Sequence, residues 1–371
     1  MNSSIPEFAQ AVVIERFGQS ATLQPVPIPD KLEPGALLVQ VEACSVCGTD
    51  VHLWRGELSL RVDLPVILGH EMVGRVVAAG TGSEKDSFNQ ELNVGDRIVW
   101  SHAECKQCRF CVSGLPTLCA NKRSYMYENC REYPYLLGGF GEYAYVLPDS
   151  GRVRVPDNVS NELASLSSCA FRSVVNAFNQ VGQISPSDVV MIQGIGPLGL
   201  LGVAMAKLAG SRKIIALGEP AERRELAKRF GADDVFSIAE ASGEERRAAV
   251  LGATEGNGAD LVFEFSGNPR AFTEGLELVA PGGRYMVVGQ LGTGEVQFAP
   301  SLITKKNLQV MGSFSGSIRH YWQALEIVSR HQGDMPFAEL ITGTYGLDEV
   351  DDALNAMRAE TEIKPLIVPG K

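Results

Sequence analysis

The sequence predicts a two-domain α/β protein, in which an antiparallel, barrel-like domain precedes a doubly wound parallel sheet. Two observations support this fold class. Short apolar stretches broken by glycine, proline and acidic turns fill roughly the first 150 residues, a pattern typical of antiparallel sheets. From about residue 161, strand-like and helix-like stretches alternate, as expected of a parallel sheet covered by helices on both faces.

The strands of the first domain are expected at Ala11–Glu15, Ala36–Ala43, Val73–Ala79 and Arg97–Trp100. The parallel sheet is expected to use Val189–Gln193, Lys213–Leu217, Asp260–Phe265 and Arg284–Val288, with helices at Leu198–Ala209 and Ala221–Phe230. The last stretch reads as two helices and a strand, Tyr321–Arg330, Leu347–Ala359 and Lys364–Val368. We therefore place the domains at 1–168 and 169–314, followed by a C-terminal segment at 315–371.

Size and charge narrow the functional class. The 371 residues suffice for two domains of about 100–200 residues. The net charge of −11 argues against a nucleic-acid partner, because phosphate binding favours a basic surface. No apolar run reaches about 18 residues, so we expect no membrane span. The N-terminus lacks a signal-peptide pattern, and we expect a cytoplasmic protein whose eight cysteines serve metals or catalysis.

Four cysteines within one short stretch form the strongest motif. The spacing C-x2-C-x2-C-x7-C joins Cys105, Cys108, Cys111 and Cys119. Four thiolates suit a closed, tetrahedral Zn(II) site, which stabilises a loop and leaves no position for a substrate. An iron–sulfur cluster is the main alternative, although ferredoxin motifs space their cysteines differently.

Cys47 and His70 are candidate ligands of a second, catalytic zinc. Such a site needs three protein ligands and an open fourth position. Taken singly, His70 could equally be a core histidine, and Cys47 a small buried side chain. Spacing alone does not bring either residue to a third ligand.

A glycine-rich turn follows the expected strand Val189–Gln193 and opens a helix. It comprises Gly194, Gly196, Pro197, Leu198 and Gly199. In this context G-x-G-x-x-G indicates a dinucleotide site, in which the glycines allow a tight turn, approach of the pyrophosphate and close packing of the helix on the strand. The helix N-terminus would receive the phosphates. A glycine-rich turn in another kind of α/β sheet is the alternative.

The end of the next strand bears on the choice of cofactor. Gly218 leaves room for a 2′-phosphate, which Arg223 or Arg224 could bind. Glu219 argues for NAD, because a carboxylate accepts from the ribose 2′-hydroxyl and repels phosphate. The arginines could also simply form a solvated helix face. We favour NAD over NADP.

Together these motifs resemble the zinc-containing medium-chain dehydrogenase/reductase family, and within it the zinc alcohol dehydrogenases. The resemblance covers essentially the whole chain and rests on Cys47-Gly48-Thr49-Asp50-Val51-His52, Gly69-His70-Glu71, the four-cysteine lobe, the Gly194–Gly199 turn and Ile363-Lys364-Pro365-Leu366-Ile367. It implies a GroES-like catalytic β-barrel, a Rossmann nucleotide domain and a C-terminal return to the catalytic domain. It also implies two zinc ions per chain, one catalytic and one structural.

The resemblance assigns the remaining site residues. Cys47, His70 and Cys169 would hold the catalytic zinc, Glu71 would lie beside it and Asp50 would orient His70. A cysteine at position 169 is typical of the alcohol branch, whereas polyol dehydrogenases usually carry an acidic residue there. Thr49 and His52 would pass the substrate proton to solvent, Ser173 would pack beside the nicotinamide, and Lys364 would contact the pyrophosphate. Gly48 departs from relatives with a basic residue there, which would put more weight on Lys364.

The expected function is the reversible, NAD-dependent oxidation of a hydrophobic primary or secondary alcohol to an aldehyde or ketone. An NADPH-dependent aldehyde or ketone reductase on the same fold is the alternative, and a binding protein without turnover is a more distant one. Candidate apolar walls of the substrate pocket are Trp54, Leu58, Trp100 and Tyr125–Tyr135. We expect a homodimer or homotetramer, with Arg284–Gly289 and Leu308–Phe314 as the candidate interface.

Overall fold

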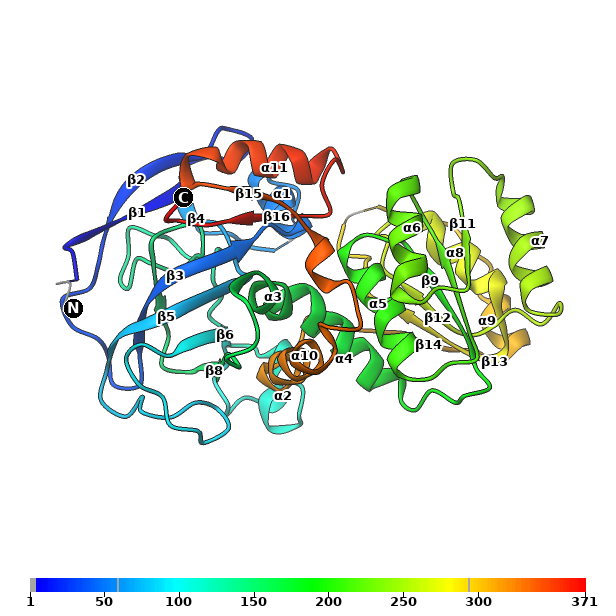
Figure 1. Ribbon diagram of the computed structural model, residues 1–371, viewed down its shortest axis with the longest axis horizontal. Helices are drawn as coiled ribbons and strands as arrows, with labels where there is room; N and C mark the ends of the chain where they lie inside the picture. The colour runs from blue at the N-terminus through cyan, green and yellow to red at the C-terminus, as the bar shows by residue number, and fades with distance from the viewer. Residues whose placement is uncertain (1–4, 59, 293) are drawn as a thin grey trace. The chain divides into compact units, whose positions relative to one another are not determined.

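The computed structural model describes residues 5–58, 60–292 and 294–371, which form two compact units (Figure 1). The first unit comprises Met1–Arg172, Gly316–Gln332 and Phe337–Lys371. The second unit comprises Ser173–Ser315 and Gly333–Pro336. The chain therefore enters the second unit after Arg172 and returns to the first near its C-terminus.

The first unit contains two sheets, which are mostly antiparallel. One has the order β2-β1-β4, and the other has the order β15-β16-β3-β5-β6-β8 with β7 also paired to β3. Their strands are β1 (Phe8–Ile14), β2 (Thr22–Pro27), β3 (Leu37–Ser45), β4 (Val66–Ile67), β5 (Met72–Ala79), β6 (Arg97–Ala103), β7 (Tyr143–Val146), β8 (Ser150–Arg154), β15 (Ile341–Tyr345) and β16 (Lys364–Ile367). The C-terminal strand β16 pairs with β3 on one side and with β15 on the other, so Lys364 and its neighbours lie in an inner strand of this sheet.

Most helices of the first unit are short, although α10 has 14 residues. They are α1 (Gly48–Arg55), α2 (Arg109–Val112), η1 (Pro116–Leu118), α3 (Asn161–Leu166), α10 (Ile318–His331), η3 (Phe337–Leu340), η4 (Leu347–Glu349) and α11 (Val350–Arg358). A π-helical turn, η2 (Ser167–Phe171), continues α3 and leads into α4 (Arg172–Val181). Single π-helical turns are frequent at functional sites.

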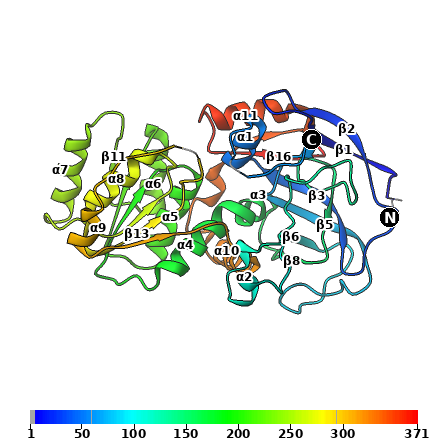
Figure 2. The ribbon, with the colours of Figure 1, turned by 180° about the vertical axis from the view of Figure 1, so that it is seen from behind.

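The second unit is a six-stranded parallel sheet in the order β11-β10-β9-β12-β13-β14. Its strands are β9 (Val189–Gln193), β10 (Lys213–Leu217), β11 (Asp234–Phe236), β12 (Ala259–Glu264), β13 (Val279–Val287) and β14 (Gln309–Gly312). The helices are α5 (Pro197–Leu208), α6 (Ala221–Phe230), α7 (Gly243–Ala253), α8 (Pro269–Leu278) and α9 (Ser301–Lys306). Helix α5 contacts α6, whereas α8 contacts α7 and α9, so helices cover both faces of the sheet (Figures 1 and 2).

The structure confirms the predicted fold class. The order of the parallel strands is the 3-2-1-4-5-6 order of a doubly wound nucleotide fold, and the sheets before it are mainly antiparallel. Helix α6 ends at Gly231, which adopts the left-handed conformation (φ 114°) that glycine tolerates best. The sequence analysis missed α1, an eight-residue helix with little apolar periodicity that carries several site residues.

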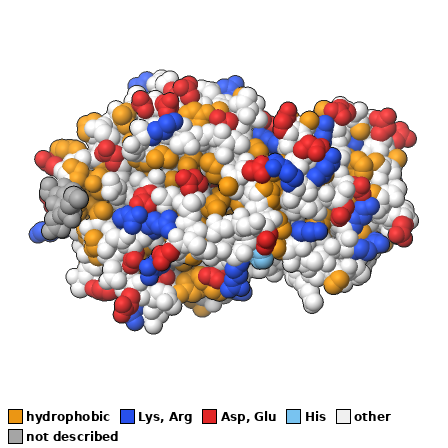
Figure 3. Space-filling view, viewed as in Figure 1, with side chains coloured by type: hydrophobic (Ala, Val, Ile, Leu, Met, Phe, Trp, Pro, Cys, Tyr) orange, Lys and Arg blue, Asp and Glu red, His pale blue; other side chains and the backbone are white. Residues whose placement is uncertain are grey.

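Surface charge and helix length add two observations. Acidic and basic side chains are interspersed over the face shown in Figure 3, so the net charge of −11 is not gathered into one patch there. Among the described residues, no helix is long and apolar enough to cross a membrane.

Candidate metal centres and nucleotide site

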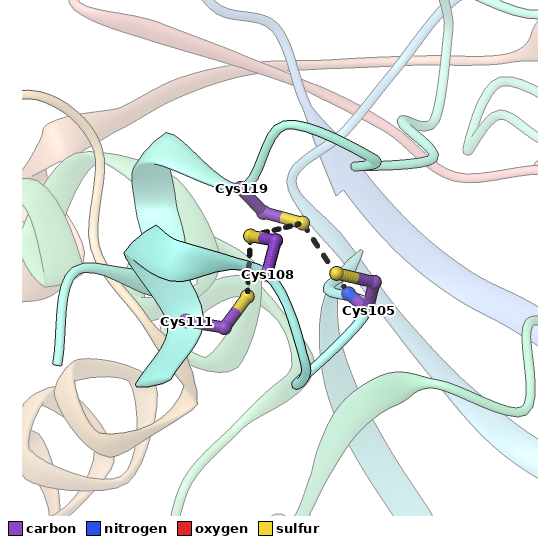
Figure 4. Close-up of side chains that lie close together, drawn as sticks. All are labelled: Cys105, Cys108, Cys111 and Cys119. Carbon is purple, nitrogen blue, oxygen red and sulfur yellow. Dashed lines mark hydrogen bonds between the residues drawn. The ribbon is translucent and has the colours of Figure 1, made fainter. Parts of the chain in front are cut away.

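The four cysteines of the lobe converge around α2 and η1 (Figure 4). Their sulfur atoms all lie within 4.8 Å of one another; Cys108 Sγ is 3.6 Å from Cys111 Sγ and 3.9 Å from Cys119 Sγ. A tetrahedral zinc with bonds of about 2.3 Å separates its sulfurs by about 3.8 Å, whereas a disulfide needs about 2.05 Å. The lobe therefore has the donor set and spacing of a closed zinc site.

Backbone amides of the lobe favour a thiolate, the form of cysteine that binds metal. Hydrogen bonds from the backbone of Cys111 and Ala120 lower the pKa of Cys108 to about 6. Cys105 N–H donates to Cys119 Sγ at 3.3 Å, and Asn121 Nδ2 donates to Cys105 Sγ at 3.6 Å. The short chain segment that carries the sulfurs thus also supplies donors to them.

A second group of ligand atoms gathers from three separate segments of the first unit. Cys47 is the residue before α1, His70 lies between β4 and β5, and Cys169 lies in the π-helical turn η2. One ligand atom from each of these residues and from Glu71 lies within 4.8 Å of the others, and Cys169 Sγ is 3.3 Å from His70 Nε2. Two sulfurs, an imidazole nitrogen and a nearby carboxylate match the donor set of a catalytic zinc site.

The Asp50 carboxylate contacts two of the segments that carry these candidate ligands. Its carboxylate accepts hydrogen bonds from Cys47 N–H at 2.8 Å and from Gly69 N–H at 3.0 Å. Asp50 Oδ1 also lies 3.5 Å from His70 Nδ1, a buried nitrogen without a hydrogen-bond partner among the described residues. One side chain therefore holds the backbones of two candidate ligand segments and faces the ring of His70, leaving Nε2 directed at the sulfurs.

Glu71 is fully buried within a polar network. Ser45 Oγ donates to Glu71 Oε2, Ser165 Oγ donates to the Glu71 carbonyl at 2.6 Å, and Lys364 Nζ lies 2.6–2.7 Å from the carboxylate oxygens. Burial raises the pKa of Glu71 to about 7, although the Lys364 charge opposes that shift. Neither Ser45 nor Ser165 was singled out from sequence, because nothing local links them to residue 71.

The position of Lys364 corrects one prediction. The sequence analysis assigned this side chain to a pyrophosphate, but only 1% of its surface is exposed and its amino group is paired with Glu71. A dinucleotide contact requires an accessible cation, because a buried amino group that leaves its carboxylate strands that charge. We therefore assign Lys364 to the neutralisation of Glu71.

Thr49 and His52 lie three residues apart on α1, which places them on one helix face. Thr49 Oγ1 is 3.7 Å from Cys47 Sγ, so the hydroxyl borders the candidate zinc group. The His52 ring is 55% exposed, and its Nδ1 lies 3.2 Å from Glu57 Oε2. One end of this pair touches the ligand group and the other reaches solvent.

Arg172 is a buried residue that the sequence analysis did not identify. Its Nε donates to the Ser168 carbonyl at 2.7 Å and its Nη1 to the Gly316 carbonyl at 2.9 Å. The guanidinium also lies 4.9 Å from the ring centre of Tyr321. Arg172 thus joins the turn that carries Cys169 to the start of α10; its place three residues after Cys169 was the available signal.

The glycine-rich turn of the second unit has the geometry that each glycine predicts. Gly194 has φ 88°, and a side chain on Gly199 would come within 1.7 Å of the Gly194 carbonyl oxygen. A side chain on Gly196 would meet no atom within 4 Å, so the backbone there is open to a ligand. Pro197 is the first residue of α5 and Leu198 the second, which leaves the helix N-terminus facing this opening.

Packing at the end of β10 explains Gly218 differently from the sequence analysis. A side chain there would come within 2.3 Å of Ile195 Cγ1, so packing against the glycine-rich turn accounts for this glycine without any 2′-phosphate. Arg223 is buried, and Arg224 forms ion pairs with Glu219 and with Glu240 at 3.0 Å. The two arginines are therefore not free surface cations.

Glu219 carries charge at the edge where a ribose would lie. Ser237 Oγ and Ala239 N–H donate to its carboxylate, the latter at 3.0 Å. Burial alone would raise its pKa, but these hydrogen bonds and the Arg224 charge outweigh that effect and lower it. The site therefore presents an ionised carboxylate at neutral pH.

Two of the proposed apolar pocket walls are wrong. Trp100 and Tyr125 are each only 1% exposed and pack edge to face in the core of the first unit, so no substrate reaches them. Trp54 and Leu58 are partly buried at the margin of that core, and Trp54 Nε1 donates to the Gln19 carbonyl at 2.6 Å. Ser173 lies in the first turn of α4 and is buried.

Two family models match the chain. Residues 33–157 match the alcohol dehydrogenase GroES-like domain, and residues 197–330 match the zinc-binding dehydrogenase domain. The chain is 33% identical to 5-exo-hydroxycamphor dehydrogenase of Pseudomonas putida over 97% of its length and 99% of the relative. It is 37% identical to L-threonine 3-dehydrogenase of Pyrococcus horikoshii over 94% of its length and 95% of the relative.

A solved structure agrees with these relatives. An alcohol dehydrogenase from Thermotoga maritima superimposes with a TM-score of 0.91 at 34% identity, covering 97% of this chain and 99% of the other. The fold, the two cysteine-containing groups and the glycine-rich turn define a zinc-type dehydrogenase. The chain belongs to the zinc-containing medium-chain dehydrogenase/reductase family and is an oxidoreductase.

Proposed function

We propose that this enzyme reversibly oxidises an apolar primary or secondary alcohol to the aldehyde or ketone, with NAD as hydride acceptor. The observation that carries the proposal is the convergence of Cys47, His70 and Cys169 beside Glu71. Three ligands that include two sulfurs and one imidazole leave a fourth position of a tetrahedral metal open. That open position separates a catalytic zinc from the closed site of the cysteine lobe.

The two groups would hold zinc with different consequences. Cys105, Cys108, Cys111 and Cys119 would hold a structural ion that stabilises the lobe. Cys47, His70 and Cys169 would hold a zinc whose Lewis acidity lowers the pKa of an alcohol oxygen and polarises a carbonyl. The 3.3 Å separation of Cys169 Sγ and His70 Nε2 is close to the roughly 3.6 Å expected between sulfur and nitrogen ligands of one tetrahedral zinc.

Thr49 and His52 supply a route for the proton. Thr49 Oγ1, beside Cys47 Sγ, accepts the proton that leaves the alcohol hydroxyl, and the exposed His52 ring delivers it to solvent. NAD, when bound, would supply the hydride acceptor for oxidation of the alcohol, and NADH would supply the hydride for reduction of the carbonyl.

The described residues favour NAD over NADP. Gly218 is explained by packing against Ile195, and Arg224 is paired with Glu219 and Glu240. The ionised Glu219 carboxylate would accept from a ribose 2′-hydroxyl and repel a 2′-phosphate. The NADPH-dependent reductase remains the alternative outcome of the cofactor test.

An apolar substrate is supported by the surroundings of the ligand group. Burial raises the pKa of Tyr127 to about 12, and its ring is near enough to His70 and Asp50 for their charges to act on it. Trp54 and Leu58 add partly buried apolar surface at the core margin. One relative is named for hydroxycamphor and another for threonine, so the substrate must be measured directly.

A substrate and cofactor panel tests the proposal. Purified enzyme is supplied with zinc, apolar primary and secondary alcohols, a polyol and L-threonine, each with NAD and NADP, while absorbance of the reduced nicotinamide is followed. We expect the highest kcat/KM for an apolar alcohol with NAD. A higher value for threonine or the polyol would overturn the substrate class, and a higher value with NADP would overturn the cofactor.

Because the described cysteines are free thiols, we place the enzyme in the reducing cytoplasm.

A further inference from the structure

Glu264 is a fully buried carboxylate at the carboxyl end of β12. Its Oε1 accepts from Ser266 Oγ and from Gly267 N–H, both at 2.7 Å, and its Oε2 accepts from Gly289 N–H at 3.2 Å. The Glu264 backbone carbonyl also accepts from Val288 N–H at 3.0 Å and from the same Gly289 N–H at 3.1 Å. One acidic residue therefore joins the loop after β12 to the loop after β13.

The loop after β12 lies at the position where the parallel sheet reverses its order, and the loop after β13 packs against it. Strands β9 and β12 are neighbours, but the chain runs outward from β9 through β10 and β11 before it returns to β12. Ligands of such sheets bind at this switch point, beyond the carboxyl ends of the strands. A side chain on Gly194 would come within 2.7 Å of Ser266 Cα, so the glycine-rich turn lies directly against the loop that Glu264 holds.

The two halves of the parallel sheet are suited to different halves of a dinucleotide. The half made by β9, β10 and β11 carries the glycine-rich turn and Glu219, the groups suited to the pyrophosphate and the adenosine ribose. The half made by β12, β13 and β14 is left for the second nucleotide, which carries the nicotinamide. The loops joined by Glu264 belong to that second half.

Both loops depend on glycine and need an external restraint. Gly267 has φ 70°, and a side chain on Gly289 would come within 2.5 Å of Gly267 N, so neither position accepts a larger residue easily. Glycine has the greatest backbone freedom to lose, which makes ordering such loops upon ligand binding costly. A buried carboxylate that accepts from both loops orders them before the ligand arrives.

We propose that Glu264 is a positioning residue that pre-orders the Ser266–Gly267 and Gly289 loops to receive the nicotinamide ring of the cofactor. This inference rests on the proposed nicotinamide-dependent function. It assigns Glu264 no contact with the reacting atoms. Its effect on the cofactor is carried by the Ser266–Gly267 and Gly289 backbone.

The test compares NADH with ADP-ribose, which lacks the nicotinamide, by calorimetric titration of the zinc-loaded full chain. Glu264→Gln keeps the shape but replaces one acceptor with a donor that faces a backbone N–H. We expect the Kd for NADH to rise about tenfold, the value of one hydrogen bond to a charged group, while the Kd for ADP-ribose changes less than about twofold. Amide exchange at Gly267, whose N–H donates to the carboxylate, should accelerate.

Asp260→Asn is the matched control, because Asp260 accepts from Val189 N–H at 2.7 Å near the opposite end of the same strand. It should leave both Kd values unchanged. If Glu264→Gln does not fold, Ser266→Ala removes one donor to the carboxylate and should still weaken NADH alone. Unchanged NADH binding in the folded variant, or equal weakening of NADH and ADP-ribose, would overturn the inference. Wild-type protein that binds neither ligand would instead overturn the proposed function.

Discussion

Cys169 and Cys130 are two thiols of the first unit with different surroundings. Cys169 lies 3.3 Å from His70 within a group of four candidate ligands, whereas Cys130 is buried and its N–H donates to the Pro65 carbonyl. Only a thiol among convergent ligand atoms can complete a metal site. This difference allows one cysteine to serve as the control for the other.

Cys169→Ser is expected to remove one of two zinc ions per chain and to lower kcat/KM at least about 100-fold, because a neutral hydroxyl replaces a thiolate ligand. Metal analysis and initial rates check both effects. Cys130→Ser should keep both ions and most of the activity. Two zinc ions and full activity in Cys169→Ser would show that this residue is no ligand.

Among the structural elements, the turn between β9 and α5 contains glycines with two different roles. Gly199 allows close packing, and Gly196 leaves the backbone open to a ligand. Gly199→Ala would drive a methyl group into the Gly194 carbonyl, and we expect a loss of about 1–3 kcal/mol in unfolding free energy together with weaker NADH binding. Gly196→Ala meets no protein atom, so stability should stay within about 0.5 kcal/mol while the NADH Kd rises about tenfold or more.

Gly252→Ala is the control for both variants, because Gly252 lies in α7 with open space around it. It should stabilise the protein by about 0.5–1 kcal/mol through helix propensity and leave cofactor binding unchanged. Denaturant titration and NADH fluorescence supply the two measurements. Normal NADH binding by Gly196→Ala would show that the pyrophosphate of the cofactor does not bind at this turn.

The first turn of α10 predicts a pH dependence of stability. Ser317 N–H donates to His320 Nδ1 at 3.0 Å, and burial, with the charges of Arg319 and Arg172, lowers the pKa of His320 to about 4. The unfolded chain therefore binds this proton at higher pH than the folded chain, and stability falls as the pH drops from about 6.5 to about 4. Because the ring is partly open to solvent, we expect about 1–2 kcal/mol of this loss rather than the roughly 3 kcal/mol of the full shift.

His320→Asn keeps an acceptor for Ser317 N–H but does not titrate. Its unfolding free energy should fall less than that of the wild type over the same pH range, as measured by urea titration at successive pH values. Above about pH 7 the two proteins should respond to pH alike. Identical acid profiles would mean that His320 is not the group responsible.

For the whole molecule, β14 is the last strand of the parallel sheet on one side, and no other described strand pairs with its outer edge. Val310 and Phe314 are exposed along or just beyond this strand. The predicted interface also included Arg284–Gly289, but β13 lies between β12 and β14, so that part of the prediction is wrong. An unpaired apolar edge is a template for pairing with another copy of the chain.

We therefore expect a homodimer or a homotetramer built from such pairs through β14. Val310→Lys should shift sedimentation towards the monomer, because a charge on an edge strand opposes pairing. Ile238→Lys, at an exposed apolar position that follows the opposite edge strand β11, should not. A wild-type monomer at micromolar concentration would contradict this prediction.

Features whose residues are close together along the chain could be predicted from the sequence. The cysteine lobe brings four ligands together within fifteen residues, and the Gly194–Gly199 turn needs only a strand before it and a helix after it. Both motifs are local, because their geometry is set by short spacing and backbone freedom. The alternation of strands and helices likewise indicated the parallel sheet.

Features that join distant segments of the chain became visible in the folded structure alone. Strand pairing and the π-helical turn bring Cys47, His70 and Cys169 together, and the return of β16 to β3 turns Lys364 from an expected phosphate contact into the partner of Glu71. Packing of Gly218 on Ile195 likewise gives that glycine a different meaning. Register and burial determine these contacts, and neither is a property of a short stretch of sequence.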